Sequence, residues 1–146
     1  MLERKLSLDL LRHFNELRSA IEPQAAALAA RAGASPAYAA IEAGLQRMEA
    51  AERGEDDTLE ADIAFHIAVL EASANPFFLQ FRDMVATALR TSIRFTNRFK
   101  GRSADVPAHR AVFTAIQAGD PGAARTAMTA IIGEVMEFIT TAKVKQ

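Results

Sequence analysis

The sequence contains no cysteine among its 146 residues, so it forms no disulfide and offers no thiolate to a metal. Any metal ion in this chain must therefore use nitrogen and oxygen ligands. No apolar run approaches the roughly 20 residues that cross a bilayer, and residues 1–5 lack the apolar stretch of a secretory signal. The net charge of −1 argues against a strongly basic nucleic-acid surface. We therefore expect a soluble, cytoplasmic protein without a membrane partner.

Half of the residues are apolar, and the length suits one domain, 1–146, with one hydrophobic core. Alanine, the best helix former, dominates the composition, and no segment alternates apolar and polar residues as a half-buried strand does. The sequence therefore predicts an all-α protein.

Glycine, proline and capping residues recur at intervals that suit helix ends. They predict six helices with short, antiparallel connections, over residues 8–32, 36–53, 57–74, 76–100, 104–118 and 121–142. Gly44 and Gly133 fall inside predicted helices, where glycine costs about 1 kcal/mol against alanine. We expect Gly133 to allow a close approach between helices.

Two polar side chains interrupt the apolar face of the predicted helix 57–74. Asp62 and His66 lie one helical turn apart and point in the same direction as Ile63, Phe65 and Val69. Burying a carboxylate without compensation is costly, so a hydrogen bond, a cation or a metal ion must offset it.

His109 repeats this pattern on the predicted helix 104–118, on the same face as Val112 and Ile116. Together with Asp62 and His66 it would give two imidazoles and one carboxylate, a set that suits a divalent metal ion. The alternative is a set of buried histidines that only form hydrogen bonds. His13 has no acidic or histidine partner at ligand spacing, and we interpret it as an ordinary surface or interface residue.

Arginines recur at every fourth position of the predicted helix 76–100, at Arg90, Arg94 and Arg98. This stripe is either a solvated face or the wall of an anion pocket, since a guanidinium pairs well with a carboxylate. Arg18 lies near the apolar stripe of the first predicted helix and is another candidate for holding an anion.

Three segments resemble the FCD domain, the effector-binding domain of many GntR-family transcription regulators. Arg18–Ala26 (RSAIEPQAA) resembles the motif R-x-x-[LI]-E-P-x-A-A, Asp62–Asn75 resembles D-x-x-F-H-x-x-[LIV]-x-x-[AS]-S-x-N, and His109–Asp120 resembles H-x-x-[LIV]-x-x-A-I-x-x-G-D. The three segments occur in the family's order and cover nearly the whole chain.

This resemblance implies an antiparallel bundle of six to seven helices, which forms a homodimer and binds a small organic acid in a central pocket. Many members hold a divalent metal there through one aspartate and three histidines. Asp62, His66 and His109 match three of these ligands, with zinc or nickel as the expected ion. The fourth position is Ile131, which cannot coordinate a metal, so water or the effector completes the site, or the site is metal-free.

The resulting hypothesis is a ligand-sensing and dimerisation domain that is not an enzyme. Arg18 and either Arg90 or Arg94 would bind an effector carboxylate beside the candidate metal ligands. DNA would be contacted only through a winged-helix domain, which is expected to be absent from residues 1–146. The alternatives are a metal-dependent enzyme built on the two histidines and one carboxylate, and a structural dimerisation module with a vestigial pocket.

Overall fold

A computed structural model describes residues 2–33, 36–100 and 105–144, and the side chains of residues 8–33, 36–92 and 105–141. Within these residues the chain is all-helical, as the sequence predicts. The helices are α1 (Leu2–Ala32), α2 (Pro36–Glu52), α3 (Thr58–Ala72), α4 (Pro76–Leu79), α5 (Arg82–Lys100), α6 (Val106–Gln117) and α7 (Pro121–Val144). Among the described residues, no helix is both long and apolar enough to cross a membrane.

The local stop and start signals place most helix ends correctly. Gly33, Gly54 and Gly119 all have positive φ angles, 77°, 77° and 68°, so each occupies the left-handed conformation that terminates a helix. Asp57 accepts a hydrogen bond from the Leu59 amide and caps α3. The predicted stop at residue 101 lies outside the described residues.

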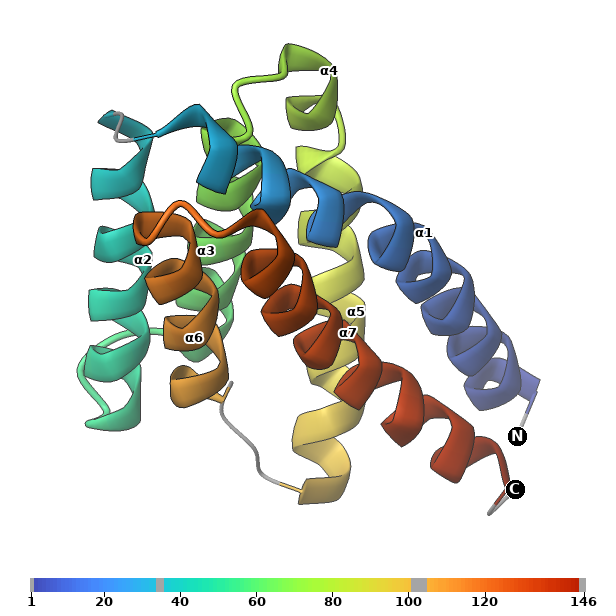
Figure 1. Cartoon of the computed structure of the whole chain (residues 1–146). Helices are drawn as coiled ribbons and strands as arrows, with labels where there is room; N and C mark the ends of the chain where they lie inside the picture. Colours follow the sequence, from blue (N-terminus) through green and yellow to red (C-terminus); the bar gives the residue numbers. More distant parts are fainter. Residues whose placement is uncertain (1, 34–35, 101–104, 145–146) are drawn as a thin grey trace.

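The prediction of one continuous helix over residues 76–100 is wrong. Asn75 caps a single turn, α4, and the amides that follow this turn bond three residues back, Gln80 to the Phe77 carbonyl at 3.3 Å and Phe81 to the Phe78 carbonyl at 3.1 Å. The chain then turns before α5 starts at residue 82, as Figure 1 shows. Phe78 and Phe81, which flank this turn, both pack against the hydrophobic core. Tertiary packing of these aromatic side chains therefore accounts for a break that no glycine or proline marks.

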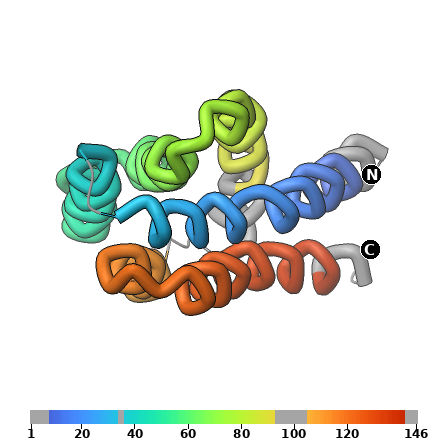
Figure 2. Tube along the Cα trace, turned by 45° about the horizontal axis from the view of Figure 1, so that its top comes forward, coloured from blue at the N-terminus to red at the C-terminus, as the bar shows by residue number. Residues whose placement is uncertain are grey.

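The two longest helices, α1 and α7, run antiparallel and side by side, and they bring the two chain ends to one end of the molecule (Figure 1). The tube in Figure 2 shows the same pair from a second direction. The helices α2, α3 and α6 lie around the halves of α1 and α7 that are farther from the two chain ends. The α1–α7 pair thus spans the molecule, while the main core lies where α1 meets α3 and α6.

Gly44 rather than Gly133 provides the close approach between helices. A Cβ atom at Gly44 would lie 2.9 Å from the Phe65 Cα atom, whereas one at Gly133 would meet no atom of the described residues within 4 Å. The expectation for Gly133 is therefore wrong, because that residue is exposed on α7. The missing side chain of Gly44 lets α2 lie directly against the part of α3 that carries His66.

Candidate metal and anion site

Asp62, His66 and His109 meet at one buried point between α3 and α6. The Nε2 atoms of the two histidines lie 3.2 Å apart, and Asp62 Oδ1 lies 3.2 Å from His66 Nε2 and 3.1 Å from His109 Nε2. His66 is 1% exposed and His109 is 3% exposed. The three side chains that the sequence singled out as metal ligands therefore form a nearly equilateral triangle of donor atoms.

Each histidine is oriented by an acceptor on its other ring nitrogen. His66 Nδ1 contacts the Glu22 carboxylate of α1, and His109 Nδ1 donates to the Asp105 backbone carbonyl at 2.6 Å. A backbone carbonyl can only accept a hydrogen bond, and so can the Glu22 carboxylate when it is ionised at pH 7. Nδ1 therefore carries the proton in each ring. Asp105 also caps α6 through its side chain, which accepts from the Ala108 amide. The start of α6 thus fixes the direction of the His109 ring.

This arrangement directs the lone pairs of both Nε2 atoms toward each other and toward Asp62. Three acceptors at about 3.2 Å repel unless a proton or a cation lies among them. In the metal-free protein an additional proton on His66 Nε2 meets this need. A divalent ion would meet it for all three atoms together.

The three separations suit direct coordination. Tetrahedral zinc with bonds of about 2.0–2.1 Å places neighbouring ligand atoms about 3.3 Å apart. The observed edges of 3.1–3.2 Å are close to that value. A carboxylate or a backbone carbonyl that accepts from Nδ1–H, as Glu22 and Asp105 do here, is also the usual outer partner of a metal-bound histidine. The residues present therefore fit a divalent ion with nitrogen and oxygen ligands, and they would supply three of its positions.

The buried charges shift one another's pKa values strongly. Burial alone would raise the pKa of Asp62, but the close contacts with the His109 and His66 rings outweigh it and hold that pKa far below its usual range. Burial likewise opposes the ionised form of Glu22, yet Arg18 and His66 lower its pKa to about 2. Burial would lower the pKa of His66, but Glu22 and Asp62 raise it to about 9. The metal-free site is thus a network of charges that stabilise one another.

Arg18 joins this network from the first helix. Its Nε atom lies 2.5 Å from Glu22 Oε2, and the whole side chain is only 1% exposed. Its Nη2 atom is buried and has no hydrogen-bond partner among the residues that the structure describes. A guanidinium nitrogen in this state is costly, so it marks a place where an acceptor is missing.

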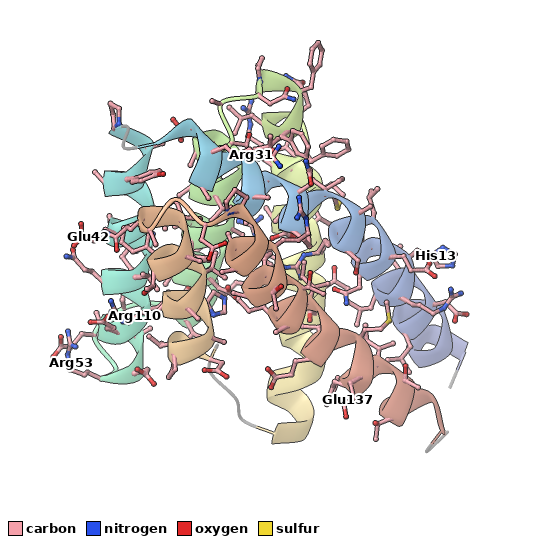
Figure 3. The ribbon with its side chains drawn as sticks, viewed as in Figure 1. His13, Arg31, Glu42, Arg53, Arg110 and Glu137 are labelled. Atoms are coloured by element: carbon pink, nitrogen blue, oxygen red, sulfur yellow. The ribbon has the colours of Figure 1, made fainter. Side chains whose placement is uncertain are left out.

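The remaining candidate residues lie apart from this cluster. Arg90 is exposed on α5 and pairs with Glu60 at 3.3 Å, which agrees with the solvated-face alternative. The side chain of Arg94 lies outside the described residues. His13 is exposed beside Arg12 and points away from the bundle in Figure 3, as expected of a surface residue. Ile131, the expected gap in the ligand set, is buried in the apolar core.

Glu22 is the residue of this buried cluster that the sequence did not mark as a candidate. It appears in the sequence only as part of a motif, although it is fully buried and contacts both Arg18 and His66. A signal was available, because at 100° per residue Glu22 lies on the same helix face as the buried Ala25 and Ala29. An acid on an apolar face of α1 predicts a buried carboxylate with a compensating partner, as Asp62 does on α3.

The chain is similar to known proteins over most of its length. A family model described as the FCD domain matches residues 13–134. The galactonate operon transcriptional repressor of Escherichia coli (strain K12) is 33% identical over 127 residues, which cover 84% of this chain and 55% of that protein. The uncharacterized HTH-type transcriptional regulator YieP of the same strain is 30% identical over 122 residues, which cover 82% and 52%. The chain thus spans about half the length of these curated relatives.

A solved structure supports the fold. A chain titled Streptococcus agalactiae GntR matches with a TM-score of 0.73 and 24% identity, over 90% of this chain and 60% of that one. The all-helical bundle predicted from the sequence is therefore a known architecture. The resemblance found in the three motifs is confirmed as well, since the family match spans all of them. The chain belongs to the FCD domain family of GntR-type regulators.

Proposed function

We propose that this chain is the ligand-sensing and dimerisation domain of a GntR-type transcription regulator, and that it binds a small organic acid at the buried cluster of α1, α3 and α6. Its curated relatives are named as transcriptional regulators, which supports a sensing role over an enzymatic one. DNA would be contacted by a winged-helix domain of the regulator and not by the helical bundle. Acid binding would change how two such domains are placed in a homodimer.

The unpartnered Nη2 atom of Arg18 is the observation that carries this proposal. The atom is buried and needs an acceptor, and the planar guanidinium fork suits a carboxylate better than any other common anion except phosphate. The Nε atom of the same side chain is already held by Glu22, so the group is oriented before any ligand arrives. A carboxylate placed at Nη2 would remove the desolvation cost that the free protein carries.

We further propose that Asp62, His66 and His109 hold a divalent ion beside this arginine. When bound, the ion would supply a Lewis-acidic centre that accepts a carboxylate or hydroxyl oxygen. With neutral histidines, the formal charge of Arg18, Glu22, Asp62 and the ion together is +1. A site of this charge favours an anionic ligand. Because Ile131 offers no ligand atom, an oxygen of the acid or water would take the fourth coordination position.

The acid to test first follows from a relative's name. The galactonate operon repressor points to galactonate, a sugar acid whose single carboxylate suits one arginine and whose hydroxyls suit an open metal position. Shorter hydroxy acids and plain carboxylates such as acetate serve as comparisons. Galactonate is the first probe, and a panel of acids would identify the class.

The test combines metal analysis with thermal unfolding. Freshly purified protein should contain zinc or nickel near one equivalent, and Asp62→Ala should contain none. Acids that fit should raise the unfolding temperature of the wild type in the presence of metal, and Arg18→Met should abolish that shift. A panel of acids that gives no shift, with or without added zinc or nickel, would contradict the sensing role.

A further inference from the structure

Glu22 connects the two halves of the buried cluster. It lies in the middle of α1 and is 0% exposed. Its two carboxylate oxygens have separate partners, since Oε1 contacts His66 Nδ1 and Oε2 contacts Arg18 Nε. One side chain therefore contacts both the candidate metal ligand on α3 and the candidate anion-binding group on α1.

We infer that Glu22 is a positioning residue, which orients His66 Nε2 toward a divalent ion and Arg18 Nη2 toward an acid, and so links the two binding events. This inference rests on the proposed function and assigns a role within the same site. Glu22 touches neither ligand in this role and acts only through its two neighbours.

The chemistry of the contacts requires a carboxylate at this position. Both neighbours present N–H donors, so each oxygen must accept. The amide of a glutamine has one accepting oxygen, and its NH₂ group would face an N–H donor on the other side. An ionised carboxylate also makes the imidazole a stronger ligand through the Nδ1–H contact. A glutamine at position 22 would therefore lose one contact and part of the ligand strength of His66.

A purely structural role is the alternative. Glu22 would then serve only to neutralise the buried Arg18 cation, and its loss would lower stability without a specific effect on the ion. Zinc affinity separates the two roles. A matched control is Asn15→Leu, since Asn15 is also buried on α1 and donates to the Ile132 carbonyl of α7 at 2.9 Å.

The experiment is a zinc titration of the full chain by chelator competition, with zinc alone as the probe. Glu22→Gln should raise the zinc Kd about tenfold to 100-fold, the range known for outer partners of metal-bound histidines. Asn15→Leu should stay within about threefold of the wild type, although both variants unfold at lower temperature. An unchanged zinc Kd in folded Glu22→Gln would overturn the inference and leave the proposed function intact. A wild type that binds no zinc would instead remove the metal from the proposed function, and with it this role for Glu22.

A second pair of variants covers the case in which Glu22→Gln fails to fold because Arg18 is left unpaired. The double variant Arg18→Met/Glu22→Gln contains no buried cation, and its zinc Kd is compared with that of Arg18→Met alone. The double variant should bind zinc about tenfold more weakly than Arg18→Met does. Nitrogen-15 NMR of the zinc-loaded wild type gives an independent readout, with the His66 proton on Nδ1 and zinc on Nε2. Equal affinities in this pair, or zinc found on Nδ1, would contradict the positioning role.

Discussion

Arg18 and Arg90 belong to two regions that differ in how far they bury an arginine side chain. Arg18 is 1% exposed in the cluster of α1, α3 and α6, and its partner Glu22 is equally buried. The side chain of Arg90 is 49% exposed on α5, where it pairs with Glu60, itself 46% exposed. The first pair is 2.5 Å long and the second 3.3 Å.

The comparison shows that the sequence pattern around an arginine does not decide its role. Both residues are cations on helices with an apolar stripe, and both were candidates for an effector carboxylate. Water screens the Arg90 pair, so that pair adds little to stability and has no need of a ligand. The Nη2 atom of Arg18 is buried and has no hydrogen-bond partner among the described residues, so the fold holds it ready for an acceptor.

The largest expected effect is the loss of stability on removing Arg18, and removing Arg90 is the comparison. In metal-free protein, Arg18→Met should lower the free energy of unfolding by about 3–5 kcal/mol, because it leaves the buried Glu22 carboxylate with His66 as its remaining partner. Arg90→Met, the matched control, should change it by about 0–1 kcal/mol. Urea unfolding monitored by circular dichroism measures both values. Equal losses in the two variants would mean that burial does not separate these regions.

The pH dependence of stability sharpens the same contrast, again in metal-free protein. The pKa of Glu22 falls from an ordinary 4.5 to about 2 on folding, so its contribution is complete above pH 4.5 and is lost as the pH falls toward 2. The pKa of His66 rises from 6.5 to about 9, so its contribution is complete below pH 6.5 and is lost as the pH rises through 9. Stability should therefore be highest between about pH 4.5 and 6.5. It should fall by on the order of 3 kcal/mol on the alkaline side and further on the acid side, where the lowered pKa of Asp62 adds to the loss.

Two variants identify the source of the alkaline fall. His66→Gln should remove it, because the group that releases a proton between pH 6.5 and 9 is gone, whereas the exposed His13→Gln should retain it. Saturating zinc should reverse the slope in this window, since an ion on Nε2 displaces the proton. Thermal unfolding at half-unit pH steps measures the stability of the two variants and of the zinc-saturated protein. A wild type with constant stability from pH 6.5 to 9 would contradict the raised pKa of His66.

Local signals in the sequence predicted most of the fold. Gly33, Gly54 and Gly119 end helices through their own backbone freedom, and Asp57 caps the helix that follows it within two residues. Such features need no knowledge of the rest of the chain. The break between α4 and α5 has no such signal, since it depends on how aromatic side chains pack against distant helices.

The candidate site was predictable to a similar extent. Periodicity on single helices placed Asp62, His66 and His109 on apolar faces, and the structure brings them together. The contact between Glu22 and His66 joins residues 44 positions apart, so no helical spacing reveals it. The same limit applies to Arg90, because periodicity gives a face of a helix but not what covers that face.

The smallest expected effect tests the spacing of α2 and α3, on which the buried region depends and the exposed face of α5 does not. A Cβ atom at Gly44 would lie 2.9 Å from the Phe65 Cα and 3.0 Å from the Phe65 backbone nitrogen, so main chain would have to move. Gly44→Ala should therefore cost about 1–3 kcal/mol by overpacking.

Gly133→Ala is the matched control, because its added methyl group meets nothing within 4 Å and alanine favours the helix by about 1 kcal/mol. The two substitutions are chemically identical, yet they should shift the urea midpoint in opposite directions. Phe65 precedes His66 in the chain, and its ring packs edge-on against the His109 ring, with centroids 4.9 Å apart. A displaced α3 should therefore also weaken zinc binding in Gly44→Ala, while Gly133→Ala should bind zinc as the wild type does. Stabilisation in both variants would show that α3 can move away from α2 without disturbing the donor triangle.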